Sequence, residues 1–173
     1  LVLFGDSLIH MWDHEGQSYI YCLDTKTGKN KWKVKRNEKT TWHTPLIVEH
    51  GGGTQVVANG KLRSRGYDLE TGKLLWECGG QISSPVTCPV TRDGVVYCST
   101  GYRKSSIVAI PLDSEGDITG TEKIVWKSGD AAPYIASPLL FDDLLYVTKQ
   151  SSAVLSCLDA KTGKAYYAKK RLP

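Results

Sequence analysis

The sequence predicts an all-β fold, a β-propeller of about four blades, each a four-stranded antiparallel sheet. Three observations support this prediction. A short motif recurs at a nearly fixed period, since Asp24, Asp68, Asp113 and Asp159 stand 44, 45 and 46 residues apart. Alternating apolar residues precede these positions, which is typical of strands, and no segment shows the apolar spacing of a helix. Short strands repeated at such a period are typical of propeller blades.

The recurring motif predicts a tight turn between two strands, followed by an aromatic residue. Intact copies run from Asp24 to Trp32 and from Asp68 to Trp76, a copy ending in Tyr167 begins at Asp159, and a degraded copy runs from Asp113 through Gly116 to Trp126. Asp can accept hydrogen bonds from backbone amides two or three residues later, and Gly can adopt the positive φ that reverses the chain. A ring at one register of every repeat suggests a socket between neighbouring units, whereas ordinary hairpins with a core aromatic are the alternative. The structural motif comprises Asp24, Gly28, Trp32, Asp68, Gly72, Trp76, Trp126, Asp159, Gly163 and Tyr167.

Each unit is expected to be a meander of four strands. The predicted strands of the first two units are 1–6 (with a turn), 8–12, 19–23 and 31–35, then 46–48, 55–58, 62–69 and 73–78. Those of the last two units are 86–91, 95–99, 106–112 and 123–127, with an insertion at 114–121 that lengthens the last hairpin, then 139–141, 144–148, 154–158 and 165–169. Thr44-Pro45, Ser84-Pro85 and Ser137-Pro138 precede first strands, where a residue need not donate to the ladder. The predicted blades span about 1–44, 45–83, 84–136 and 137–173.

The two ends of the chain resemble each other in a way that suggests a longer array. Residues 139–146 align with the stretch that starts at residue 1, so the chain is expected to begin inside a first strand and to end after a fourth strand. Blades taken from a longer ring expose two apolar faces. We therefore expect self-association, pairing with another segment, or closure into a four-blade ring.

Composition excludes several classes of function. The chain of 173 residues is 40% hydrophobic and 23% charged, which is ordinary for a globular domain. No apolar run is long enough for a transmembrane helix, and no signal peptide is visible, although the chain does not begin with Met and this decides nothing about its compartment. The net charge of +4 is mild, and the basic residues are scattered through turns, so nucleic-acid binding is not expected.

Cysteine and histidine usage does not predict a metal site. Among the five Cys residues, Cys22 and Cys157 hold the same repeat position, which favours small buried side chains. Cys88 and Cys98 flank a hairpin and are either bonded to each other or free. The sequence contains no Cys-x-x-Cys, its four His residues lack the spacing of zinc ligands, and it has no phosphate loop or nucleophile elbow.

The Asp-x-x-Thr-Gly-Lys-x-x-Trp turn, the Ser-Pro pairs and the blade length together resemble the pyrroloquinoline quinone (PQQ) repeat family, over essentially the whole chain. In that family the repeat is the tryptophan-docking motif of quinoprotein dehydrogenases. It also occurs in the BamB-like propellers of outer-membrane assembly, which bind no quinone. Kelch and WD repeats are the structural competitors, but kelch spacing is shorter, and Trp12-Asp13 occurs once without the earlier His of WD repeats. Family propellers have seven or eight blades, so four would make about half a ring.

The resemblance implies a non-catalytic scaffold for protein–protein interaction, located in the periplasm or cell envelope, with a partner in the outer-membrane assembly machinery and no cofactor. The alternatives are a segment of a PQQ-dependent dehydrogenase, with PQQ and calcium, and a sensor domain of a larger protein. A quinoprotein needs calcium held by oxygen ligands and an Asp as general base, and its family commonly has adjacent cysteines. The chain has no adjacent Cys pair, and its motif Asp residues belong to turns. We therefore assign no catalytic, cofactor-binding or metal-binding residue.

The loops give the candidate interaction surface. In a propeller, loops from the fourth strand to the next first strand lie on the same face as loops between the second and third strands. Here these loops contain aromatic rings beside cations, a composition typical of recognition surfaces, while solvated loops with half-buried rings are the alternative. The candidate interaction residues are Trp42, His43, Tyr102, Arg103, Tyr134 and Lys149.

Overall fold

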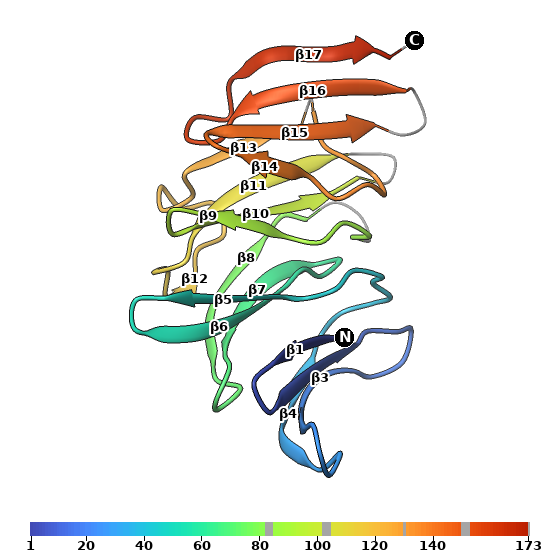
Figure 1. Cartoon of the computed structure of the whole chain (residues 1–173), viewed down its shortest axis with the longest axis vertical. Coiled ribbons are helices and arrows are strands. Elements are labelled where there is room, and N and C mark those ends of the chain that lie inside the picture. Colours follow the sequence, from blue (N-terminus) through green and yellow to red (C-terminus); the bar gives the residue numbers. More distant parts are fainter. Residues whose placement is uncertain (82–84, 102–104, 130, 150–152, 173) are drawn as a thin grey trace.

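The computed structural model describes residues 1–81, 85–101, 105–129, 131–149 and 153–172. Within these ranges the backbone forms strands, turns and bends and no helix, so the all-β prediction is confirmed. The strands form four sheets that follow one another in chain order (Figure 1), and all their strand pairs are antiparallel except one in the second sheet. We refer to these sheets as blades 1 to 4.

Each blade contains a four-stranded meander, as the repeat predicted. Blade 1 comprises β1 (Val2–Phe4), β2 (Ser7–Trp12), β3 (Ser18–Asp24) and β4 (Asn30–Arg36), and blade 2 comprises β5 (Leu46–His50), β6 (Gly53–Ala58), β7 (Arg63–Asp68) and β8 (Leu74–Gly79). Blade 3 comprises β9 (Val90–Arg92), β10 (Val95–Thr100), β11 (Ser106–Pro111) and β13 (Trp126–Ser128), and blade 4 comprises β14 (Leu139–Phe141), β15 (Leu144–Lys149), β16 (Val154–Asp159) and β17 (Ala165–Arg171). Blade 3 departs most from the prediction, because its first strand begins at Val90 rather than at 86.

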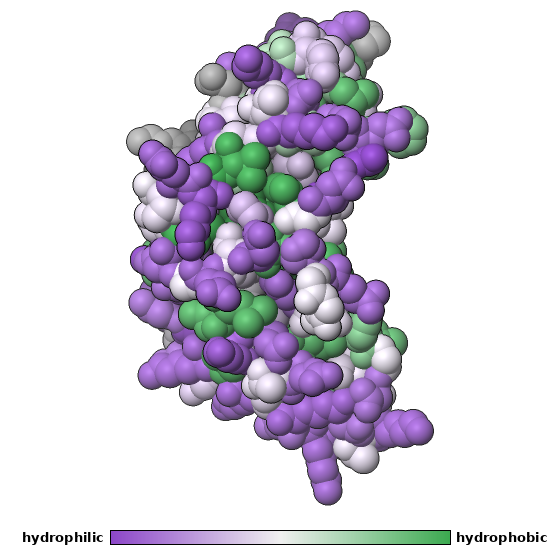
Figure 2. Space-filling view, turned by 90° about the vertical axis from the view of Figure 1, so that its left-hand side faces the viewer, coloured by the Kyte–Doolittle hydropathy of each residue, from purple (hydrophilic) through white to green (hydrophobic). Residues whose placement is uncertain are grey.

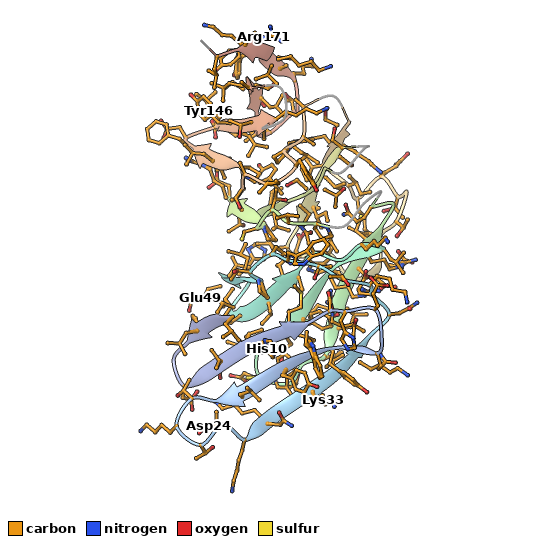
Figure 3. The ribbon with its side chains drawn as sticks, turned by 90° about the vertical axis from the view of Figure 1, so that its right-hand side faces the viewer. His10, Asp24, Lys33, Glu49, Tyr146 and Arg171 are labelled. Carbon is orange, nitrogen blue, oxygen red and sulfur yellow. The ribbon has the colours of Figure 1, made fainter. Side chains whose placement is uncertain are left out.

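The blades are stacked along an arc, with their first strands on its inner side. Strand β1 contacts β5, and β9 contacts β14, so first strands of neighbouring blades lie next to each other. These strands lie along the left edge of the molecule in Figure 3, and the same side is hollowed at the right of Figure 2. This is the arrangement of part of a propeller ring, in which blades surround a central channel.

Apolar side chains fill each of the three junctions between blades. Val56 and Val57 show how: both are fully buried, but Val56 packs in the cluster between blades 1 and 2, and Val57 in the cluster between blades 2 and 3. Because neighbouring strand residues point to opposite faces, an inner blade is buried on both faces, and adjacent residues of its second strand are buried apolar side chains. A third cluster, which includes Leu145 and Ile107, joins blades 3 and 4.

The strand register corrects the predicted repeat in blade 3. Asp24 pairs with Ser7, and Asp68 and Asp159 hold the same register in their blades, but in blade 3 this register belongs to Pro111, opposite Val95. The prediction that Asp113 is the motif residue was therefore wrong. In the intact turns the Asp amide donates to the backbone oxygen of Lys29, Lys73 or Lys164 at 2.8–2.9 Å. Proline has no amide hydrogen, so the same tight turn cannot close in blade 3.

The insertion in blade 3 reaches across to blade 2 and does not simply lengthen its own hairpin. Strand β12 (Gly116–Asp117) pairs in parallel with β8, which makes blade 2 a five-stranded sheet. The amide of Ile118 then donates to the backbone oxygen of Glu77 at 3.0 Å, and its side chain is buried against Trp76 in the core cluster. Gly79 donates to the Thr119 hydroxyl at 2.7 Å. The insertion thereby covers the outer edge of β8 and ties the two blades together.

Candidate functional site

The motif aromatics lie at the junctions between blades, near the hairpin turns. Trp32 of blade 1 donates its Nε1 hydrogen to the backbone oxygen of Leu69 in blade 2, at 2.8 Å. Its ring lies against Gly72, where an added Cβ would come within 2.8 Å of the indole carbons. Gly72 has a φ of +72°, so glycine there both permits the turn and leaves room for the ring. Trp126 of blade 3 makes the same two contacts with blade 4, through the Ala160 oxygen at 2.7 Å and Gly163.

The junction between blades 2 and 3 is built differently. Trp76 is fully buried and donates its Nε1 hydrogen to Oε1 of Gln55 at 3.0 Å. Gln55 in turn donates from Nε2 to the backbone oxygen of Leu112 at 2.8 Å. Leu112 corresponds to Leu69, because both amides bond across the hairpin in the same way. Gln55 therefore bridges two groups that are joined directly at the other junctions. The sequence analysis did not single out Gln55. The feature that could have identified it is an amide side chain at the start of an apolar strand.

At each end of the arc, one partner of the contact between motif ring and turn glycine is present without the other. Tyr167 of blade 4 holds the motif register and is 37% exposed, and no atom lies within 4 Å of the position that a Cβ on Gly28 of blade 1 would take. The turn of Gly28 is nevertheless well formed. The Thr27 hydroxyl and amide donate to Asp24 at 2.7 and 2.8 Å and lower the pKa of that carboxyl. The carboxylates of Asp68 and Asp159 accept the same bonds in their turns.

A buried ion pair organises the opposite side of the arc, where the predicted interaction loops lie; Figure 3 looks onto this side. The side chains of Arg36 and Asp13 are fully buried, with Nε 2.8 Å from Oδ1 and Nη2 3.1 Å from Oδ2. Arg36 also donates to the Tyr67 hydroxyl at 2.9 Å and to the backbone oxygen of Asn59 at 3.2 Å, both in blade 2. Because every polar group of this pair has a partner, the charges are tolerated at the junction.

A second set of ion pairs continues toward the outer edge of blade 2. Glu38, from the loop after blade 1, pairs with Arg65 and also accepts the amide hydrogen of Leu62 at 2.8 Å. Arg65 pairs with Glu77 at 3.0 Å, and Arg63 pairs with Asp117 of the insertion at 2.7 Å. The hydrogen bonds from Thr119, and then the contact with Arg63, hold the pKa of Asp117 at about 2. The contacts of Glu38 hold the start of loop 37–45 against blade 2.

The structure separates the predicted interaction residues. Trp42 is 64% exposed, Tyr134 is half-buried and Lys149 is exposed at the end of β15. The prediction that His43 belongs to an interaction surface was wrong, because its side chain is buried. Its Nε2 accepts the amide hydrogen of Asn59 at 3.0 Å, which ties the loop to blade 2. Tyr102 and Arg103 lie outside the described residues. Sequence reasoning placed Leu62 in a strand, yet it lies between β6 and β7, with 46% of its side chain exposed on the loop side.

The described residues show no metal centre. All five cysteines are free, including Cys88 and Cys98, whose pairing the sequence left open. No group of three or more His, Cys, Asp or Glu side chains within the described ranges could hold a metal ion. The same ranges contain no helix that is long and apolar enough to cross a membrane.

Comparisons with known proteins identify the repeat. A family model described as outer membrane protein assembly factor BamB matches residues 9–169. No curated protein matches the chain. Among solved structures, BamB from Moraxella catarrhalis has a TM-score of 0.59 at 17% identity, covering 92% of this chain and 52% of BamB. Quinohemoprotein alcohol dehydrogenases from Comamonas testosteroni and Pseudomonas putida HK5 have TM-scores of 0.68 and 0.69 at 14% and 13% identity, covering 97% and 96% of this chain but 36% and 33% of theirs.

The chain thus spans about half the length of the BamB structure and about a third of each dehydrogenase. At these identities the solved structures show the shared propeller fold. The family match extends over nearly the whole chain and includes strands of all four blades. The chain therefore belongs to the PQQ-type β-propeller family described as outer membrane protein assembly factor BamB.

Proposed function

We propose that this chain is a non-catalytic β-propeller scaffold that binds a protein partner through its loop side. The proposal rests on the exposure of the Trp42 side chain on a loop of fixed conformation. Its side chain is 64% exposed, although the loop that bears it is held firmly in place. Exposed tryptophans on defined surfaces are among the residues that contribute most to protein–protein binding.

Three hydrogen bonds fix loop 37–45 around Trp42. The Thr41 hydroxyl donates to Asp13 of blade 1 at 3.0 Å, and the Trp42 amide donates to the backbone oxygen of Pro85 at 3.1 Å, in the loop before blade 3. His43 accepts the amide hydrogen of Asn59 in blade 2. The loop is therefore tied to three blades. Because its conformation is already set, a partner that covers the indole loses little entropy in ordering it.

The family supports the kind of partner and the compartment. Its description names outer-membrane protein assembly, so we propose a component of that machinery as the partner, and the periplasm or cell envelope as the location. In this proposal the protein needs no cofactor. The dehydrogenases in the comparison share the fold, which alone does not favour catalysis here.

The test measures binding of the protein to a purified, immobilised outer-membrane assembly complex. Trp42→Ala should weaken binding by about 30-fold, which corresponds to roughly 2 kcal/mol, the usual threshold of a hot-spot residue. Lys26→Ala is the matched control, since Lys26 is exposed in a hairpin turn on the opposite side of the arc and should have no effect. Equal binding of wild type and Trp42→Ala would reject the loop side as the interface.

A second assay separates the scaffold from the dehydrogenase alternative. The protein is incubated with PQQ and Ca²⁺, and the reduction of an artificial electron acceptor by primary alcohols is followed. The scaffold proposal expects no turnover above the rate of PQQ and Ca²⁺ alone. Saturable turnover that requires all three components would replace the scaffold by a quinoprotein.

A further inference from the structure

The two ends of the arc expose opposite sides of the kind of junction that joins the inner blades. Blade 1 lies at the bottom of Figure 1 and blade 4 at the top, so the chain does not close into a ring by itself. Apolar side chains are exposed at both ends, among them Leu3 of blade 1 at 61% and Leu139 of blade 4 at 63%. The strand registers show which partner each end face fits.

The outward face of blade 4 has the layout of the face that blade 1 turns towards blade 2. Four residues lie at one register across the four strands of blade 4: Leu139, Tyr146, Cys157 and Tyr167. Their counterparts in blade 1 all pack in the core between blades 1 and 2: Val2, Ile9, Cys22 and Trp32. Blade 4 therefore presents the side of a junction that carries the motif ring.

The outward face of blade 1 has the layout of the face that blade 2 turns towards blade 1. Three apolar residues lie at one register across its first three strands: Leu3, Leu8 and Leu23. Their counterparts in blade 2 all pack in the core between blades 1 and 2: Ile47, Val56 and Tyr67. Blade 1 therefore presents the receiving side of a junction.

The turn that would receive a motif ring is already formed in blade 1. The Thr25 amide donates to the backbone oxygen of Asp6 at 3.0 Å, and the Leu69 amide makes the same bond in blade 2, so Thr25 is the counterpart of Leu69. Leu69 is 6% exposed, and its backbone oxygen accepts the bond from Trp32. Thr25 is exposed, and a Cβ added at Gly28 would meet no atom within 4 Å. The turn of blade 1 thus has the shape of a receiving turn and lacks the ring.

Where the two end faces depart from the inner junction, the departures match each other. Val34 of blade 1 and Ala58 of blade 2 pack in the same core. The corresponding residues at the ends of the arc are Lys170 of blade 4 and His10 of blade 1. The His10 ring stacks on Tyr21, with centroids 6.1 Å apart. A lysine has a long apolar stem and a cation that is attracted to aromatic faces, so it suits this pair of rings.

We propose that two copies of the chain join head to tail into one ring, with Tyr167 of each copy packed on the Gly28 turn of the other. Each end face fits the opposite end rather than itself, because one carries the ring and the other carries the turn. Such a contact between unlike surfaces forms a closed ring when its rotation allows. Propellers typically have four to eight blades, so two arcs of four blades complete a ring and a third arc does not fit.

Light scattering over a range of concentrations measures the pairing. The mass should rise to twice 19.1 kDa and no further. Thr25→Glu places a carboxylate against the Tyr167 ring, and Tyr167→Lys removes that ring. Each should weaken the contact about tenfold at each junction, and so weaken a dimer with two identical junctions about 100-fold. Leu62→Lys is the control, because Leu62 is 46% exposed on the loop side of blade 2, away from both ends, and this variant should pair like the wild type. Circular dichroism checks that each variant is folded.

A mixture of Thr25→Glu and Tyr167→Lys tests the head-to-tail arrangement. One junction of the mixed pair is unaltered, and the other sets the two introduced charges against each other. The mixture should therefore pair within about tenfold of the wild type. A wild-type mass of 19.1 kDa at all concentrations, or a mass that continues to rise beyond two copies, would overturn the proposal. So would an effect of only one of the two variants, or a mixture that pairs no more tightly than either variant alone.

Discussion

Gln55→Leu tests whether the amide bridge holds blades 2 and 3 together. Gln55 is 8% exposed, so leucine fills a similar volume but can neither accept from Trp76 nor donate to Leu112. The indole hydrogen and the Leu112 oxygen are then buried without partners, at about 1–3 kcal/mol each. Burial of the leucine side chain offsets about 1–2 kcal/mol of this cost. We expect a net loss of about 2–4 kcal/mol in the free energy of unfolding.

Urea unfolding followed by tryptophan fluorescence and far-ultraviolet circular dichroism measures this loss. A thermal midpoint lower by roughly 5–15 °C should accompany it in a domain of this size. Trp32→Phe is the comparison at the neighbouring junction, where a single direct bond to Leu69 is lost, and should cost about 1 kcal/mol.

A double-mutant cycle identifies the bridge itself. Trp76→Phe removes the indole hydrogen, so adding it to Gln55→Leu removes a buried group that would otherwise be unpaired. The two substitutions should therefore cost about 1–2 kcal/mol less together than the sum of their separate effects. Additivity within about 0.5 kcal/mol, or a loss below about 0.5 kcal/mol for Gln55→Leu alone, would refute the bridging role.

Four further predictions concern the buried ion pair, the turn glycines, His43 and the two ends of the arc. Asp13→Asn should destabilise the protein by about 3–5 kcal/mol in urea unfolding, because it leaves the buried guanidinium of Arg36 without its counter-charge; a loss within the range of ordinary surface substitutions would contradict this. Gly72→Ala should cost about 1–2 kcal/mol more than Gly28→Ala, since both glycines have positive φ but only Gly72 lies under a tryptophan ring; equal costs would show that the ring contact is unimportant. Burial, and then the charge of Arg36, lower the pKa of His43 to about 3 from 6.5. The unfolded chain therefore binds a proton below about pH 6.5 that the folded chain does not, so stability should fall as the pH drops from 6.5 towards 3, and His43→Gln should show a smaller fall between pH 7 and pH 4.5 in urea midpoints. Light scattering should give a mass near twice the 19.1 kDa of one chain, because the outward faces of blades 1 and 4 expose apolar side chains; a mass of 19.1 kDa at all concentrations would exclude self-association.

The turns could be predicted from the sequence because their chemistry is local. Asp24 and Thr27 are close in the chain, so the hydrogen bonds that hold their turn depend on residue types at fixed short spacing. The four strands of each blade follow from alternation and turn residues for the same reason. The degraded repeat misled the prediction because Asp113 preserved the period of the motif, whereas the register selected Pro111.

The candidate site depended on contacts between distant segments. His43 and Trp42 are neighbours with similar composition around them, yet one ring is buried against Asn59 and the other is exposed. No local pattern distinguishes them, because the difference arises from how three blades meet at one loop.

By itself, the sequence determined the repeat, the class of fold and the chemistry of the intact turns, because these rest on periodicity and on hydrogen bonds within a few residues. Only the tertiary structure decided that the insertion adds a strand to blade 2, that Gln55 bridges Trp76 to Leu112, and that Arg36 pairs with Asp13 in the interior. Those outcomes depend on which side chains from separate blades are buried together. A polar group excluded from water must find its partner among whatever neighbours the packing provides.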